Sequence, residues 1–468
     1  MTKTAKISIL VLTTFFASYL NLWQLASDYL FTDEILYVQA GQEYKQADYS
    51  LNLQHPLLGK YVSALSSGSA VTDVFRLRLP FAVLGVLSGL VVFAIARREL
   101  GFYWGILGFL LYTSLPFLHD TNRAVLLESP MHFFWLLFSY FLFLFYRSHQ
   151  QIHLSLASVA FGLAMSVKFT SIVLLPALLV SFMFTDSVKQ LTHRQLIRTL
   201  IRFAMISGGM FLLHYGHLIV VQGLNGLLDV VRAFKDVILT RNSQGKPHIV
   251  AGVLYQTSPW WFYLHYLKQA YGMSALGLAG ILTFLGSKKK TPQSIYWLTL
   301  FVTSLLYFQL LSLKNARYLA SIELPLVFLM LAGLKWLHRK YGMAVIALIL
   351  IFVLPTLFRT VYAQPTAYHA AYLHIVRETA NLTNGDRVLI FGSVRSAKWY
   401  FKAPEDVVVI RKDLEALKHE LFDFKYILVD AEERLKFSDN LLFVHLDAFS
   451  DRYDKYLFHE VTLYVLKK

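Results

Sequence analysis

Long apolar stretches recur along this chain, and they constrain its fold more than any other feature. Stretches of roughly 16–22 residues appear about eleven times, and each is long enough to cross a bilayer as an α-helix. Of the 468 residues, 56% are hydrophobic and only 16% are charged, which exceeds the apolar content that a soluble core requires. The sequence therefore predicts a polytopic α-helical membrane protein, with spans near residues 7–23, 80–96, 102–118, 124–146, 153–167, 169–185, 203–221, 272–287, 294–312, 318–334 and 343–362.

Short basic clusters lie in alternate connections between these stretches and indicate how the chain is oriented. By the positive-inside rule the clusters are cytoplasmic; they lie at residues 3–6, 97–98, 147, 189–202, 288–290 and 335–340. The N-terminus is then cytoplasmic, while a first outer loop (24–79), a second (223–271) and all residues after 363 lie outside. The net charge of +15 is dispersed among these clusters, so it does not indicate nucleic-acid binding. Because the chain has no cysteine, disulfides, thiolate metal sites and a cysteine nucleophile are excluded.

A change of composition near residue 365 divides the chain into two predicted domains. Residues 1–363 form the transmembrane domain, whose segments 30–44 and 55–65 are amphipathic enough to be short interfacial helices. Residues 364–468 are more polar and alternate helix-like with strand-like segments, which predicts a small extracytoplasmic α/β domain. No nucleotide-binding glycine fingerprint follows its first predicted strand, RVLIFGS.

Asp33 and Glu34 form an acidic pair about ten residues past the first predicted span, in a segment otherwise suited to membrane contact. A carboxylate in a partly apolar cavity can act as a general base and remove a proton from an acceptor hydroxyl. The alternative is a solvated interfacial pair or a helix cap after Thr32.

His55 and Lys60 lie five residues apart around a proline turn in the same loop. A turn of this kind can direct both side chains into one cavity, where they would contact a phosphate. The alternative is a hydrogen-bonded histidine beside a lysine that extends to the lipid headgroups.

Three ionisable residues lie at the outer ends of predicted spans. A charge at membrane depth is energetically unfavourable, so such residues often belong to a functional site. Lys168 is the clearest of them, although it can also extend to the headgroups from a short outer turn. Arg123 and Glu128 either contribute to a site or form a structural ion pair with each other.

Several motifs occur in an order that resembles the phospholipid carrier-dependent GT-C glycosyltransferases, which include the protein O-mannosyltransferases and the bacterial lipid-A aminoarabinose transferases. The acidic pair after the first span is followed by His-Pro-x-x-Gly-Lys at residues 55–60. The other matching segments, which extend the resemblance over residues 7–335, are Arg123 with Leu126–Pro130, Gly162–Thr170, Ser258–Tyr263, Lys314, Arg317-Tyr318 and Pro325. The resemblance implies a GT-C fold and a sugar donor linked to a polyprenyl phosphate.

The resemblance also implies a role for each site residue. Asp33 matches the acid regarded as the catalytic base in this family, and Glu34 would support it. The residues that would lie near the carrier phosphate or complete the cavity are His55, Lys60, Arg123, Glu128, Lys168, Arg317 and Tyr318.

Two departures from the family pattern bear on metal and phosphate binding. The aminoarabinose transferases have Glu-Lys-Pro-Pro where this chain has Gln54–Leu57, so a metal ligand is missing and a divalent metal is a doubtful cofactor. They also carry an arginine where Gln256-Thr257 stand here, so phosphate binding must depend on other basic residues; Lys246 and His248 are nearby candidates.

These observations predict an inverting membrane glycosyltransferase, with Asp33 as base, that acts at the extracytoplasmic face. It would transfer a hexose or pentose from a polyprenyl-phosphate carrier to a lipid, glycan or protein acceptor. The partners expected are this donor, the acceptor and membrane lipids, with no nucleic acid, and the location expected is the bacterial inner membrane.

Two other classes of protein remain open on this sequence. A transporter or lipid flippase also has many spans with buried charges, but it predicts inverted repeats and broken spans in matching halves. A scaffold would use the C-terminal domain to recruit partners, and the intact Asp33-Glu34 pair argues against a degenerate catalytic half.

Overall fold

In the computed structural model the chain forms two compact units. The first contains Met1–Leu25, Tyr37–Gly245 and Ser258–Tyr362, and the second contains Ala26–Leu36, Lys246–Thr257 and Ala363–Lys468. The structure describes residues 2–26, 30, 32–66, 73–185, 192–236, 248–250, 253–255, 257–268, 277–278, 280–282, 291–311, 314–342, 379, 386–391, 407–409, 424–430, 452–458 and 461–467.

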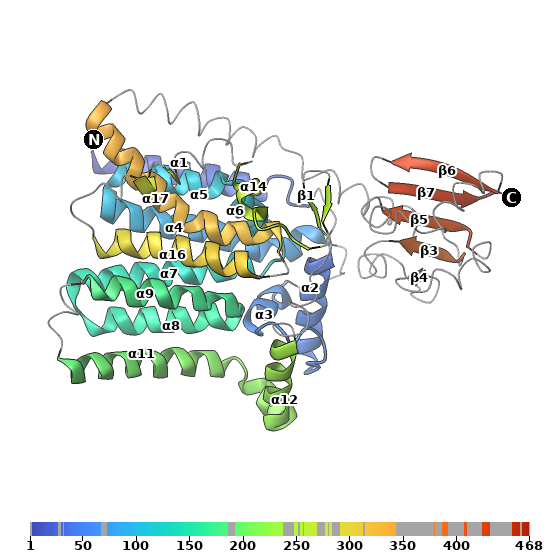
Figure 1. The fold of residues 1–468 in the computed structure, drawn as a ribbon, viewed down its shortest axis with the longest axis horizontal. Coiled ribbons are helices and arrows are strands. Elements are labelled where there is room, and N and C mark those ends of the chain that lie inside the picture. The colour runs from blue at the N-terminus through green and yellow to red at the C-terminus, as the bar shows by residue number, and fades with distance from the viewer. Residues whose placement is uncertain are drawn as a thin grey trace. The chain divides into compact units, whose positions relative to one another are not determined.

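The first unit is a bundle of helices, most of which run side by side (Figure 1). Its long apolar helices follow the predicted spans, because a backbone in lipid must satisfy its own hydrogen bonds. They are α1 (Lys3–Leu22), α4 (Val74–Leu100), α5 (Phe102–Ser114), α7 (Glu128–Ser148), α8 (Gln151–Val167), η1 (Phe169–Val173) with α9 (Leu174–Met183), α11 (His193–Leu213), α16 (Pro292–Leu310) and α17 (Leu319–Tyr341). Short helices α6 (Pro116–Asn122) and η3 (Ala316–Tyr318) precede α7 and α17, and α14 (Phe262–Lys268) precedes α16.

Among the described residues, five helices are long and apolar enough to cross a membrane: α1, α4, α7, α11 and η3 with α17. The α-helical membrane fold is therefore confirmed. The predicted number of about eleven spans stays a prediction, because the stretches near 272–287 and 343–362 lie largely outside the described residues.

Helix α17 lies inside the bundle, since every residue from Leu319 to Leu331 is buried. Its neighbours in space are α5, α6 and α16, while α7 packs on α4 and α8, and α8 packs on α11. Helices α1 and α11 instead expose large apolar side chains along much of their length, as helices in contact with lipid do.

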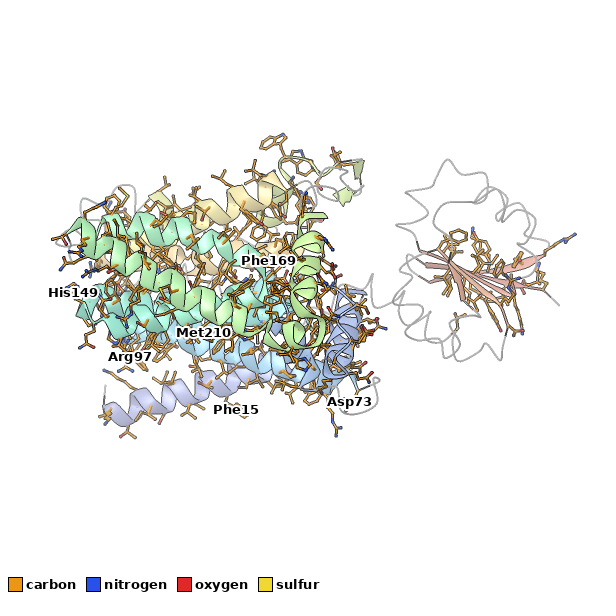
Figure 2. The ribbon with its side chains drawn as sticks, turned by 90° about the horizontal axis from the view of Figure 1, so that it is seen from below. Phe15, Asp73, Arg97, His149, Phe169 and Met210 are labelled. Carbon is orange, nitrogen blue, oxygen red and sulfur yellow. The ribbon has the colours of Figure 1, made fainter. Side chains whose placement is uncertain are left out.

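The basic last turns of two long helices lie at the same end of the bundle. Figure 2 shows Arg97 and His149 at one end and Asp73 and Phe169 at the other. The basic last turns of α4 and α7 therefore lie at the same end as the N-terminus (Figure 1), as the predicted alternation of connections requires.

One predicted span is displaced in the structure. The stretch near 203–221 contains a helix end, because α11 stops at Leu213 and a separate helix, α12 (Gly216–Asp236), begins three residues later. Apolar residues continue across this break, so hydropathy alone merges the two elements.

The first outer loop contains two helices, α2 (Thr32–Lys45) and α3 (Leu58–Ala64), in the segments predicted to be helical. They approach closely at Gly41, where an added Cβ would lie 2.6 Å from the Lys60 carbonyl oxygen and from Ser63 Oγ. The Ser63 hydroxyl donates a hydrogen bond to the Tyr37 carbonyl (2.8 Å), which joins the two helices.

The second unit contains a five-stranded mixed sheet with the order β4-β3-β5-β7-β6. Strand β3 (Val388–Phe391) is parallel to β4 (Val407–Val409) and β5 (Tyr426–Asp430), and the antiparallel hairpin of β6 (Tyr453–Phe458) and β7 (Val461–Leu466) extends the sheet. The small C-terminal sheet is confirmed, and the helices predicted between its strands lie outside the described residues. A second antiparallel pair, β1 (His248–Val250) and β2 (Val253–Tyr255), also belongs to this unit.

Candidate functional site

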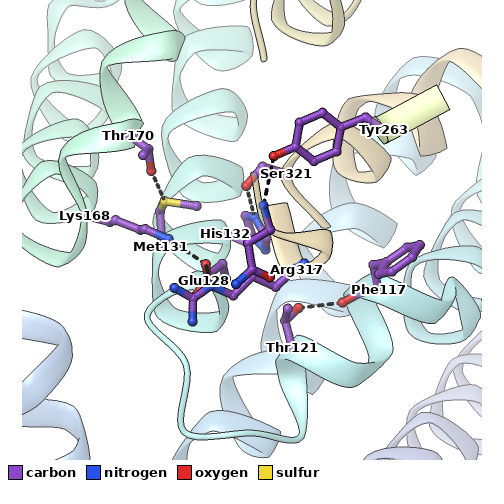
Figure 3. Close-up of polar contacts among 11 residues, drawn as sticks. Phe117, Thr121, Glu128, Met131, His132, Lys168, Thr170, Tyr263, Arg317 and Ser321 are labelled. Carbon is purple, nitrogen blue, oxygen red and sulfur yellow. Dashed lines mark hydrogen bonds and ion pairs between the residues drawn. The ribbon is translucent and has the colours of Figure 1, made fainter. Parts of the chain in front are cut away.

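Three ionisable side chains from distant parts of the sequence meet at one end of the helical bundle (Figure 3). Glu128 is the first residue of α7, Lys168 follows α8, and Arg317 lies in η3 just before α17. Lys168 Nζ lies 2.5 Å from Glu128 Oε1, and Arg317 Nε lies 3.3 Å from the same oxygen. We call these three residues the charge cluster.

The charge cluster is buried and has an excess of positive charge. The side chains of Glu128 and Lys168 are 0% and 3% exposed, and that of Arg317 is 15% exposed. Two cations surround one carboxylate, so the cluster has a net charge of +1 when all three groups are ionised. Ammonium and guanidinium groups of this kind form strong, charge-assisted hydrogen bonds with anionic ligands.

Tyrosine and histidine side chains line the charge cluster. Lys168 Nζ lies 4.6 Å from the centre of the Tyr318 ring, which also stacks on Phe308 with ring centres 4.9 Å apart. One helical turn after Glu128, His132 Nε2 lies 2.9 Å from Ser321 Oγ of α17. His132 is not among the site residues predicted from the sequence. The feature that could have indicated it is its position four residues after Glu128, on the same face of a mostly apolar helix.

Histidine 55 is close enough to the charge cluster to be affected by its charges. Partial burial and the nearby cations Lys168, Lys60 and Arg317 hold the pKa of the His55 imidazole well below its usual value. Of the predicted site residues, the structure thus brings together His55, Glu128, Lys168, Arg317 and Tyr318.

The buried Lys60 ammonium has a different environment from the one predicted. Its Nζ donates hydrogen bonds to the carbonyl oxygens of Asn52 and His55, both at 2.6 Å, and to the Tyr44 hydroxyl at 3.2 Å. Burial lowers the pKa of this ammonium, while the three oxygens replace its hydration. In this arrangement Lys60 holds residues 52–60 of the loop together, and its contact with a carrier phosphate stays a prediction.

Gly59 explains why this loop lies against the charge cluster. An added Cβ would collide with Leu127 Cδ2 and would lie 3.3 Å from Val167 Cγ1. Leu127 directly precedes Glu128 in the chain, and Val167 directly precedes Lys168. Because Gly59 has no side chain, the backbone of α3 can pack against the residues next to this ion pair.

Arg123 contacts the end of α1, and the alternative of an ion pair with Glu128 is not the one formed, because Glu128 binds Lys168 and Arg317. The Arg123 guanidinium donates to the carbonyl oxygens of Trp23 (2.6 Å) and Leu20 (3.3 Å). The last carbonyls of a helix have no partner within the helix, and a cation there also interacts favourably with the helix dipole. Arg123 therefore has a capping contact, and its part in the cavity stays a prediction.

The acidic pair lies in the first turn of α2, where Glu34 is buried and Asp33 is partly buried. From Tyr37 onward α2 belongs to the first unit, whereas Asp33 and Glu34 belong to the second. Their position relative to the charge cluster stays a prediction.

The expectation that a divalent metal is a doubtful cofactor stays a prediction. Within the described part of the chain no three His, Asp or Glu side chains lie together as a metal site would require. Lys246 and Gln256 lie outside the described residues, and for His248 only the backbone is described.

Comparisons with known proteins agree with this fold. A family model described as dolichyl-phosphate-mannose-protein mannosyltransferase matches residues 54–212. The structure resembles ArnT from Cupriavidus metallidurans bound to undecaprenyl phosphate, with a TM-score of 0.58 and 12% sequence identity over 99% of this chain and 98% of that chain. It also resembles an oligosaccharyltransferase from Archaeoglobus fulgidus, with a TM-score of 0.60 and 13% identity over 92% of this chain and 70% of that one. A comparison with curated protein sequences found no match.

These matches confirm the resemblance found in the sequence. The chain is an integral membrane protein with the fold of the GT-C glycosyltransferases. The family model covers the His-Pro-x-x-Gly-Lys motif at residues 55–60, Glu128 and Lys168.

Proposed function

We propose that this chain, which has the GT-C fold and in part matches a mannosyltransferase family model, is a membrane glycosyltransferase that uses a polyprenyl-phosphate sugar donor. The observation that carries the proposal is the charge cluster, in which a lysine and an arginine from distant parts of the chain lie together and suit the negative charge of a sugar–phosphate–lipid diester.

The arrangement of the cluster fits a phosphate at the membrane surface. Arg317 presents a guanidinium that can bind two phosphate oxygens, while Lys168 supplies a compact charge beside the Tyr318 ring. Glu128 holds both cations in place through one carboxylate oxygen. Such preorganised charge stabilises negative charge that develops on a leaving phosphate at little cost in reorganisation.

The reaction is a displacement at the anomeric carbon of the sugar. Asp33 accepts the proton of the acceptor hydroxyl as its oxygen forms a bond to the anomeric carbon. The bond from that carbon to the phosphate oxygen breaks, and its electron pair stays on the leaving polyprenyl phosphate, which Arg317 and Lys168 stabilise. Attack from the opposite face inverts the anomeric configuration.

We assign this activity to the extracytoplasmic face, because nucleotide sugars are confined to the cytosol whereas lipid-linked sugars can be presented outside. The acceptor class that we propose is a lipid, glycan or protein hydroxyl, and the location that we propose is the bacterial inner membrane. The transporter alternative has no support from the family model or from the structural matches.

Transfer of labelled sugar from a polyprenyl-phosphate donor by the purified protein in lipid nanodiscs tests the proposal. Asp33→Asn is expected to lower the turnover rate by about 100-fold or more, since a positioned base contributes that much. Asp73→Asn is the matched control, because Asp73 is an exposed acid at the start of α4. Full activity of Asp33→Asn would refute the base assignment, and no transfer by the wild-type protein from any such donor would refute the proposed function.

A further inference from the structure

Helix α12 differs from the helices that precede it in direction and in surroundings. It begins at Gly216, directly after the membrane-spanning α11, and in both Figure 1 and Figure 2 it runs across the end of the bundle instead of along it. The change of direction occurs at His214-Tyr215, and a second break lies at Gly223, whose φ of 65° is unfavourable for residues with a side chain.

One side of α12 is fixed to the first outer loop. Leu218 and Val230, together with Tyr215 before the helix, are buried in one apolar cluster with Ala40, Tyr44, Tyr49 and Leu57 of that loop. The Tyr49 hydroxyl also forms a short hydrogen bond with His217 Nδ1. The orientation of α12 about its own axis is therefore set by contacts within the protein.

The remaining surface of α12 after Gly223 is divided into an apolar side and a polar side. Leu224, Leu228 and Val231 share one side by their spacing of four and three residues, and they are 71%, 49% and 57% exposed. Exposed polar residues occupy another side with the same spacing; they are Asn225, Asp229 and Arg232, of which the last two form an ion pair at 3.0 Å.

We propose that α12 lies in the membrane interface, with Leu224, Leu228 and Val231 inserted among lipid chains and the polar side facing water. A helix that has one protein-facing, one apolar and one polar side suits a boundary between lipid and water, where such helices insert by about 5–10 Å. The occupant of the apolar side is lipid because α12 follows directly after α11, a helix long and apolar enough to cross a membrane that also exposes Ile201, Met205 and Leu213.

In this position α12 connects the first outer loop to the membrane. The loop packs on the inner side of α12 through Tyr44 and Tyr49, so insertion of the outer side fixes the depth of the loop relative to the lipid. The inference concerns the membrane contact alone and does not depend on the proposed reaction.

The absence of cysteine in the natural sequence allows a direct test by spin labelling in liposomes. Single cysteines replace Leu224, Leu228 and Val231 in one series and Asn225, Asp229 and Arg232 in the other, and collision rates with oxygen and with a water-soluble nickel complex are measured. We expect the ratio of oxygen to nickel collisions to be several-fold higher in the first series.

Two results would overturn the proposal. Equal ratios in both series, with ready access of the nickel complex, would place the apolar side in water. Low collision rates with both reagents in the first series would mean that protein, such as a second copy of this chain, covers it. Neither result would affect the sugar-transfer assay.

Discussion

Glu128 holds the charge cluster together, because its carboxylate is the shared partner of Lys168 and Arg317. Glu128→Gln removes the buried carboxylate that pairs with both cations and is expected to lower the free energy of unfolding by about 3–5 kcal/mol. Equilibrium unfolding in mixed detergent micelles measures this loss. Asp229→Asn breaks an exposed ion pair and should cost less than about 1 kcal/mol; equal stability of the two variants would contradict the role of Glu128.

His55 should make the stability of the protein depend on pH. Its pKa is lowered in the folded protein, so the unfolded chain takes up the proton first as the pH falls below about 6.5. The contribution is fully present above that pH and is lost below it. We expect the unfolding temperature of the wild type to fall more between about pH 7.5 and pH 5.5 than that of His55→Gln. The same decrease in both proteins would show that His55 titrates normally.

At the scale of elements, α3 approaches α7 and α8 closely because residue 59 has no side chain. Gly59→Ala forces a methyl group against Leu127 and Val167 and should destabilise the protein by about 1–3 kcal/mol, with loss of sugar transfer. Gly208→Ala is the matched control, since nothing lies within 4 Å of an added Cβ there. Alanine inside a helix should stabilise by about 0.5–1 kcal/mol at position 208, and a similar gain at position 59 would contradict the packing argument.

The sequence predicts the elements well where hydrophobicity alone determines them. Most apolar stretches are helices because a backbone in lipid must satisfy its own hydrogen bonds. The strands after residue 385 are indicated by the alternation of helix-like and strand-like segments there. The break between α11 and α12 was not predicted because Leu213 and Ile219 are equally apolar on either side of it. Hydropathy cannot separate a span from an interfacial helix that continues it.

The site could be predicted only in part, because its partners are far apart in the chain. Glu128 and Lys168 were identified because charged residues at the ends of spans are energetically unfavourable. Their pairing, however, depends on how α7 and α8 pack. Local spacing allowed Arg123 to pair with Glu128 as an alternative to a role in the site, whereas the fold places its guanidinium at the end of α1. Lys60 was assigned to a phosphate, whereas in the fold three oxygens, from Tyr44, Asn52 and His55, surround its ammonium.

At the scale of the whole molecule, the alternation of the helices predicts opposite locations for the two ends of the bundle (Figure 2). In the cysteine-free chain, a single cysteine at Asp73 should react with an impermeant maleimide in intact cells. A cysteine at His149 should react only after permeabilisation. The reverse pattern would place the charge cluster on the cytoplasmic side and would contradict the proposed extracytoplasmic reaction.

The affinity of the purified protein for a polyprenyl phosphate tests most directly whether the charge cluster binds the carrier phosphate. Arg317→Gln removes a cation and the bidentate contact and should weaken binding by about tenfold or more. Arg76→Gln, which alters an exposed arginine on α4, should leave the affinity unchanged. An Arg317→Gln protein that binds the lipid as tightly as the wild type would contradict the claim.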